Sequence, residues 1–136
     1  MKLRKVAVII FYDKEGRILL QNRKGINKFG VEWDWGFFGG GIEENETPKQ
    51  ALVREIKEEL DFDLKEFRYL GEYKGKASED VALILHVFVS PLGENMKRFR
   101  QKEGIGMKMF PIQDAENLKI PEHAKVIIRD LNKIFN

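Results

Sequence analysis

The segment from Thr47 to Leu60 constrains the fold more than any other, because it combines a helix start with a helical repeat of apolar residues. Thr47 is followed by Pro48 and then by Gln50, and this spacing is typical of a capped first turn. One arc of about 100° on the helical wheel holds the apolar side chains, which are Leu52, Val53, Ile56 and Leu60. The sequence therefore predicts a helix with one buried face.

The same helix carries a patch of acidic side chains beside its apolar arc. Glu55, Glu58 and Glu59 fill the neighbouring arc, with Arg54 at its edge. Glu55 and Glu59 are four residues apart, so their charges repel by a few tenths of a kcal/mol (about 0.2–0.5) unless something neutralises them. Carboxylate oxygens are the ligands that Mg²⁺ and Mn²⁺ prefer. The patch indicates a divalent metal site, and the alternative is a solvated glutamate-rich face.

A glycine-rich run comes just before this helix. Phe38 is followed by three consecutive glycines that end at Gly41. Without side chains, this backbone can turn sharply and approach an anion or a metal closely. A glycine loop by itself is usually only a turn, but next to an acidic helix it indicates a binding site.

The remaining chain predicts strands and a second helix. A hairpin is expected from strands 6–12 and 17–21, joined by a turn over 13–16 and followed by a loop over 25–41. Further strands are expected over 69–73, 81–89 and 107–110, and a second amphipathic helix over 121–135. No repeat or linker interrupts this order, so we expect one domain over residues 1–136.

Composition excludes several classes of function. The chain has no cysteine, which excludes a disulfide scaffold, thiolate zinc ligands and a cysteine nucleophile. The 24 basic and 22 acidic residues leave a net charge of +2, so no strong overall field favours nucleic acid. The apolar run 6–12 is too short to span a membrane. We expect a cytoplasmic protein with neither a membrane nor a nucleic acid as partner.

Taken together, the glycine run and the acidic helix resemble the signature of the Nudix hydrolase family. The matching residues are Gly40, Glu46, Arg54, Glu55, Ile56, Glu58, Glu59 and Phe62. Asp61 stands where the signature has Gly, at a helix end that needs a left-handed backbone, so we expect strain of roughly 1 kcal/mol there. The resemblance implies an α/β/α sandwich with a mixed β-sheet between helices.

The resemblance also implies roles for single residues. Glu55, Glu58 and Glu59 would bind Mg²⁺ or Mn²⁺, with the Gly40 carbonyl as a further ligand. Glu59 or Glu55 would be the general base, and Glu103 resembles an acid that a later loop supplies to the metal and the chemistry, with a solvated loop acid as the alternative. Arg54, placed among the catalytic residues, is expected chiefly to pair with Glu46 and hold the loop against the helix.

A second resemblance concerns the substrate. The stretch 33–40 is similar to the lead-in of nucleotide-sanitising members, in which aromatic residues can stack a base. The expected substrate contacts are Arg23, Trp33, Phe38, Gly39 and His123, each with a core, capping or surface role as its alternative. The expected reaction converts a nucleoside triphosphate, in its ordinary or an oxidised form, to monophosphate and pyrophosphate. The alternatives are another diphosphate substrate, such as a dinucleoside polyphosphate, a nucleotide sugar or capped RNA, or a silent nucleotide-binding module; a homodimer is left open.

Overall fold

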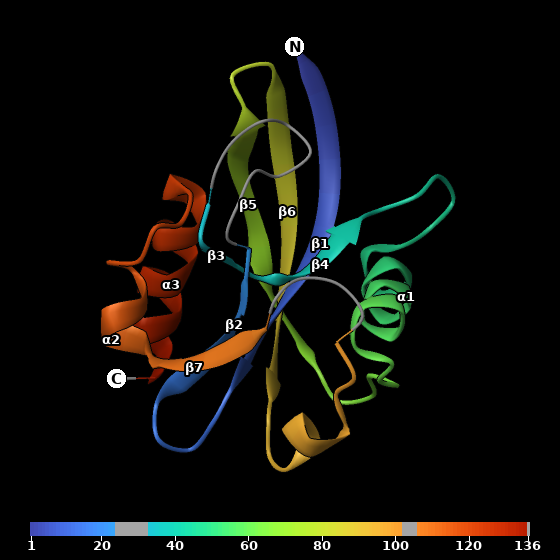
Figure 1. The fold of residues 1–136 in the computed structure, drawn as a ribbon. Helices are drawn as coiled ribbons and strands as arrows, with labels where there is room; N and C mark the ends of the chain where they lie inside the picture. The colour runs from blue at the N-terminus through green and yellow to red at the C-terminus, as the bar shows by residue number, and fades with distance from the viewer. Residues whose placement is uncertain (24–32, 102–105, 136) are drawn as a thin grey trace.

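A computed structural model describes residues 1–23, 33–101 and 106–135, in which a mixed β-sheet lies between two helical layers (Figure 1). In chain order the elements are β1 (Lys2–Tyr12), β2 (Arg17–Asn22), β3 (Trp35–Gly36), β4 (Phe38–Gly41), α1 (Pro48–Leu60), β5 (Arg68–Ser78), β6 (Val81–Pro91), the 3₁₀ turn η1 (Asn95–Arg98), β7 (Met107–Pro111), α2 (Ile112–Ala115) and α3 (Glu122–Phe135). Figure 1 shows α1 on one side of the sheet and both α2 and α3 on the other. The predicted α/β/α sandwich is confirmed.

The sheet is organised around β1. This strand pairs in parallel with β6 along one edge and antiparallel with β2 and β4 along the other. Its side chains alternate between two cores: Ala7 and Ile9 pack with α1, whereas Val8 and Ile10 pack with α3. Because both faces of β1 are covered, the strand has an unbroken apolar run in place of polar and apolar alternation.

The structure has more regular elements than the sequence predicted. The segment predicted as a loop contains β3 and β4, whose pairing with β2 and β1 supplies order that glycine-rich sequence does not signal. The strand predicted over 69–73 extends from Arg68 to Ser78, and its charged outward positions weaken the apolar pattern. The short helix α2 was also missed, since four residues are too few for a helical repeat.

The buried face of α1 lacks Val53 from the predicted set and includes Ala51 and Glu59 in addition. Val53 is 37% exposed, whereas Glu59 is only 7% exposed. At about 100° per residue, Glu59 lies roughly 20° from Leu52, whereas Val53 lies about 100° away from it. Glu59 therefore shares the core-facing side of the helix with the apolar residues, although its charge suggested the neighbouring arc.

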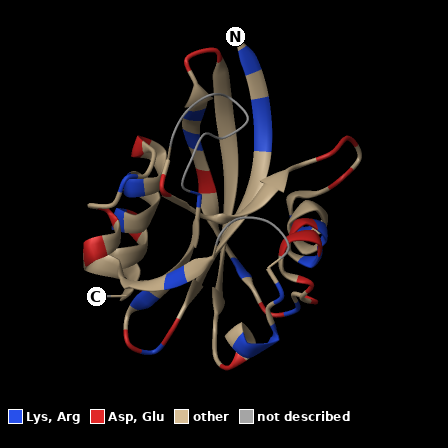
Figure 2. Cartoon of the chain, in the orientation of Figure 1, with Lys and Arg blue, Asp and Glu red and all other residues tan. Residues whose placement is uncertain are grey.

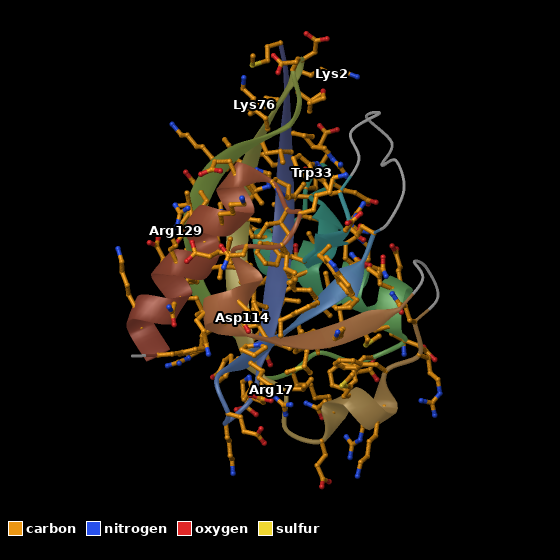
Figure 3. The ribbon with its side chains drawn as sticks, turned by 60° about the vertical axis from the view of Figure 1, so that its left-hand side comes forward. Lys2, Arg17, Trp33, Lys76, Asp114 and Arg129 are labelled. Atoms are coloured by element: carbon orange, nitrogen blue, oxygen red, sulfur yellow. The ribbon has the colours of Figure 1, made fainter. Side chains whose placement is uncertain are left out.

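The long strands β1, β5 and β6 run from one end of the sheet to the other. Figure 3 shows Lys2 and Lys76 at one end of the sheet and Arg17 at the other. The glycine strand β4 pairs with the middle of β1, from Val6 to Ile9. Within the described ranges, no helix is long and apolar enough to cross a membrane.

Asp61 ends α1 with the left-handed backbone that the sequence predicted. Its φ is 51° and its ψ is 41°, and its backbone N–H donates to the carbonyl of Lys57. We expect Asp61→Gly to raise the free energy of unfolding by about 0.5–1 kcal/mol, because glycine adopts this conformation without a steric penalty. The gain is smaller than the full strain since the exposed ion pair of Asp61 with Lys57 is lost. Urea unfolding checks this, and Asp61→Ala, which loses the pair and keeps the strain, should be less stable than wild type.

Candidate functional site

The glycines of β4 lie where α1 meets the sheet, and the first of them is required by the backbone. Gly39 has φ +135°, a conformation that side chains rarely adopt. A Cβ there would clash with the carbonyl oxygen of Ala7 and lie 2.7 Å from the Cα of Val8. Gly39 therefore lets β4 approach β1 closely, and no rearrangement of a side chain could relieve a substitution.

Gly40 makes room for a charged side chain instead of a backbone. A Cβ on Gly40 would lie 2.5 and 2.6 Å from the two carboxylate oxygens of Glu55. The carboxylate of Glu55 therefore rests on the strand, in the space that any other residue would fill. This places the first glutamate of the acidic patch directly against the glycine run.

Glu59 reaches the same strand from the next turn of α1. Its Oε1 accepts a hydrogen bond from the backbone N–H of Gly39 at 3.0 Å. Burying a carboxylate is costly unless it receives hydrogen bonds, and this bond compensates part of that cost. Two glutamates one turn apart thus bring their carboxylates to two neighbouring glycines.

Arg54 holds the loop after β4 against α1. Its Nε and Nη2 donate to the two carboxylate oxygens of Glu46 at 2.7 and 2.9 Å, and Nη2 also donates to the Gly41 carbonyl at 2.9 Å. The predicted pairing of Glu46 with Arg54 is therefore present. The bidentate hydrogen bond from Arg54 lowers the pKa of the Glu46 carboxyl to about 2 and raises the pKa of Arg54 above its usual range.

Arg54 also connects this loop to the acidic patch. Its Nη1 lies 3.0 Å from Glu55 Oε1 and 3.4 Å from Glu58 Oε1. A single guanidinium thus contacts several carboxylates and cannot neutralise all of them. The side chain of Glu58 is 59% exposed, so its carboxylate can turn away from Arg54 at little cost.

The donors of this cluster suit a hard divalent cation, although they are not assembled around one. Among the described residues, no three acidic or histidine side chains approach closely enough to form a ready-made metal site. The carboxylate of Glu55 nevertheless fills the cradle over Gly40, and Glu58 lies exposed on the same helix. Oxygen donors, excess negative charge and a bare backbone strand fit Mg²⁺ or Mn²⁺ better than a softer metal.

The residues predicted to bind substrate are dispersed. Phe38 has no exposed surface and packs edge-on against Phe11 in the core beneath α1. The predicted contact of Phe38 with a base is wrong, because the whole ring is covered. Trp33, labelled in Figure 3, is half-buried, and Arg23 is exposed with its side chain lying across Gly36. Glu103 lies outside the described residues.

His123 lies in the helical layer that covers the other face of the sheet from α1. It is the second residue of α3, and its imidazole lies over Gly75 of β5, so close that a Cβ on Gly75 would clash with the ring. Burial lowers the pKa of His123, which favours the neutral imidazole. The packing of α3 against β5 accounts for this position of the ring, on the opposite side of the sheet from the helix that carries the acidic patch (Figure 1).

One basic residue near the carboxylates was not predicted from the sequence. Arg4, in β1, is half-buried, and the charges of both Glu55 and Arg23 act on it. Figure 2 shows that the first part of β1 carries only basic charge, whereas acidic and basic segments alternate in α1. The only signal in the sequence was a basic residue ahead of an apolar strand, which does not indicate what lies across that strand.

Comparison with known proteins gives one consistent result. A family model described as the NUDIX domain matches residues 1–131. The chain is 37% identical over 73 residues to an RNA pyrophosphohydrolase of Hydrogenovibrio crunogenus, covering 54% of this chain and 41% of that protein. It is 32% identical over 91 residues to a CTP pyrophosphohydrolase of Escherichia coli, covering 67% of this chain and 64% of that protein. The chain thus spans less than two thirds of the length of either relative.

Solved structures show the same fold. The crystal structure of a MutT protein from Methanosarcina mazei superimposes with a TM-score of 0.82 at 14% identity, and covers 99% of this chain and 96% of that one. At this identity the likeness concerns the fold alone.

Proposed function

We propose that this chain, which belongs to the Nudix family, hydrolyses a diphosphate linkage in a nucleoside triphosphate with the help of a divalent metal ion. The observation that carries this proposal is the contact between α1 and β4. Glu55 lies on Gly40, and Glu59 is hydrogen-bonded to the N–H of Gly39. Carboxylates that lie against a bare glycine strand put oxygen donors beside backbone that an ion or a phosphate can approach closely.

Glu55, Glu58 and Glu59, with the Gly40 carbonyl, are the residues that would hold the ion. When bound, Mg²⁺ or Mn²⁺ supplies charge that binds phosphate oxygens and polarises the attacked phosphorus. Arg54 keeps these donors in register, because it joins the Gly41 carbonyl and Glu46 to the carboxylate of Glu55. Water adds to phosphorus, the bridging P–O bond breaks, and the products are a nucleoside monophosphate and pyrophosphate.

Between the two expected general bases, the hydrogen bonds favour Glu59. Glu55 accepts a charged hydrogen bond from Arg54 at 3.0 Å, and it lies on Gly40, whose carbonyl is the expected further ligand of the ion. Glu59 accepts from the backbone N–H of Gly39, one residue earlier on the strand. We therefore assign Glu59 to take the proton from the attacking water, and Glu55 to the ion.

The choice of a free nucleotide rests on two observations. The name of the Escherichia coli relative specifies a nucleoside triphosphate, CTP. The near balance of acidic and basic residues, at a net charge of +2, also provides no strong field for a nucleic acid chain. The RNA pyrophosphohydrolase relative makes a 5′-triphosphate RNA the second candidate.

A substrate panel tests the proposal. The protein with Mg²⁺ would be incubated with CTP, dGTP, 8-oxo-dGTP, a dinucleoside tetraphosphate and a 5′-triphosphate RNA, while pyrophosphate and orthophosphate are measured. We expect pyrophosphate from at least one nucleoside triphosphate, with kcat/KM about tenfold or more above that for RNA, and loss of turnover in EDTA. A higher kcat/KM for RNA would move the assignment to RNA. No turnover of any compound would favour a silent nucleotide-binding module.

A further inference from the structure

β5 forms an edge of the sheet. In the described parts of the chain, β6 is the only strand that pairs with β5, whereas β1 has neighbours on both sides. An edge strand carries a row of backbone N–H and C=O groups that can bind another strand, so natural proteins often keep such strands short. β5 has 11 residues, whereas β3, at the other end of the strand order, has only two. The long edge is therefore a candidate surface for strand pairing.

The middle of β5 is regular and is held in place from one face. Its pairing with β6 is continuous over residues 71–76, with an irregularity at each end of that stretch. The hydroxyl of Tyr73 donates to Asp130 of α3 at 2.7 Å, and the ring of His123 lies over Gly75. A strand that is already ordered loses little conformational entropy when it binds a partner.

The opposite face of this stretch carries both signs of charge (Figure 2). Side chains two residues apart share one face of a strand, so Glu72, Lys74 and Lys76 lie on the same face, and all three are exposed. The side chain of Glu72 is 53% exposed, and its contact with His86 is long, at 3.8 Å. The carboxylate of Glu72 is therefore accessible to a cation of another molecule.

Two copies of β5 can pair in only a few registers. Outward N–H groups recur on every second residue of an antiparallel edge, so a two-fold axis between two such edges passes through one residue and its own copy. An axis at Glu72, Lys74 or Gly75 places like charges directly opposite each other, which is unfavourable. An axis at Tyr73 places Glu72 opposite Lys74 twice, once on each side of the axis. The charge pattern therefore favours one register.

We propose that β5 is the interface of a homodimer, in which it pairs antiparallel with β5 of a second copy about an axis at Tyr73. Glu72 of each copy forms an ion pair with Lys74 of the other, and the two sheets join into one. The net charge of +2 lets two copies approach without strong repulsion. The contact does not involve the α1–β4 site, because β4 pairs with the edge of β1 that faces away from β6 and β5.

Charge reversal tests this register. The dissociation constant of the dimer would be measured by analytical ultracentrifugation over a range of protein concentrations at low ionic strength. We expect wild type to dimerise, and Glu72→Lys and Lys74→Glu each to raise the dissociation constant about tenfold or more, because each places like charges opposite each other twice. The double variant Glu72→Lys/Lys74→Glu restores opposite charges and should return to within about threefold of wild type.

Glu79→Lys is the matched control for the change in net charge. Glu79 is exposed in the turn after β5, so this variant should dimerise like wild type. Lys74→Glu provides the same test from the other side of the ion pair if Glu72→Lys does not fold. An equal loss of dimer in Glu79→Lys would show that overall charge is responsible, and the inference would then be wrong.

Hydrogen exchange gives a second readout at the backbone. Outward amides within residues 71–76 should exchange more slowly as the protein concentration of wild type rises, and this protection should be lost in Glu72→Lys. A wild type that stays monomeric at all concentrations, a dimer that Glu72→Lys does not weaken, or a double variant that remains monomeric would overturn the inference.

Discussion

Replacing Glu58 with Gln is expected to lower kcat at least about 100-fold without unfolding the protein. The side chain of Glu58 is largely exposed, and its contact with Arg54 is long, at 3.4 Å. Stability should therefore stay within about 0.5 kcal/mol of wild type, as for other exposed substitutions. An amide cannot supply the negative charge that a divalent ion needs, so Glu58→Gln should weaken binding of the ion and thereby slow the reaction.

Two measurements test whether the loss of kcat in Glu58→Gln comes from weaker metal binding. Manganese titration should show weaker binding to Glu58→Gln than to wild type, and excess Mn²⁺ should restore part of the activity. Glu44→Gln serves as the control, because Glu44 is an exposed glutamate in the loop before α1. Near-wild-type turnover by Glu58→Gln would remove Glu58 from the metal site, and an equal loss in Glu44→Gln would show that overall charge is responsible.

Alanine substitutions at the two neighbouring glycines should affect different properties: Gly39→Ala should mainly lower stability, and Gly40→Ala should mainly lower kcat. Gly39→Ala is expected to destabilise the fold by about 3 kcal/mol or more, because the new Cβ meets the backbone of β1 and the residue has φ +135°. Gly40→Ala places its Cβ against the carboxylate of Glu55. This is the far end of a flexible side chain, so it can move aside at a cost of about 1 kcal/mol.

The cost of Gly40→Ala should appear in catalysis. A displacement of about 1 Å in a group that positions the reacting atoms can lower the rate about 100-fold, so we expect a loss of kcat between tenfold and 100-fold in a protein that still folds. Urea unfolding and kcat, measured on both variants, check the pair of predictions. The interpretation of β4 would be wrong if Gly39→Ala were as stable as wild type, or if Gly40→Ala were fully active.

The local sequence correctly predicted where α1 begins and ends. The capping box of Thr47 and Gln50 is present, and the left-handed helix end falls at Asp61. Both features depend on residues within one turn of each other, so they are readable without knowledge of the fold. The prediction was wrong at Val53 and Glu59, because the buried and exposed faces of the helix were predicted there from side-chain hydrophobicity alone. The N–H of Gly39 makes a buried place for Glu59 that no local pattern could show.

What the sequence by itself determined is therefore the helix, its row of carboxylates and the glycine run before it, because each depends on neighbours along the chain. Only the tertiary structure decided which charged group rests on which glycine. Glu55 over Gly40, Arg4 over Gly41 and Arg23 over Gly36 each join residues from different elements. A glycine is compatible with any neighbour, so its place in the sequence shows that space exists there, while the packing of distant strands and helices determines what fills it.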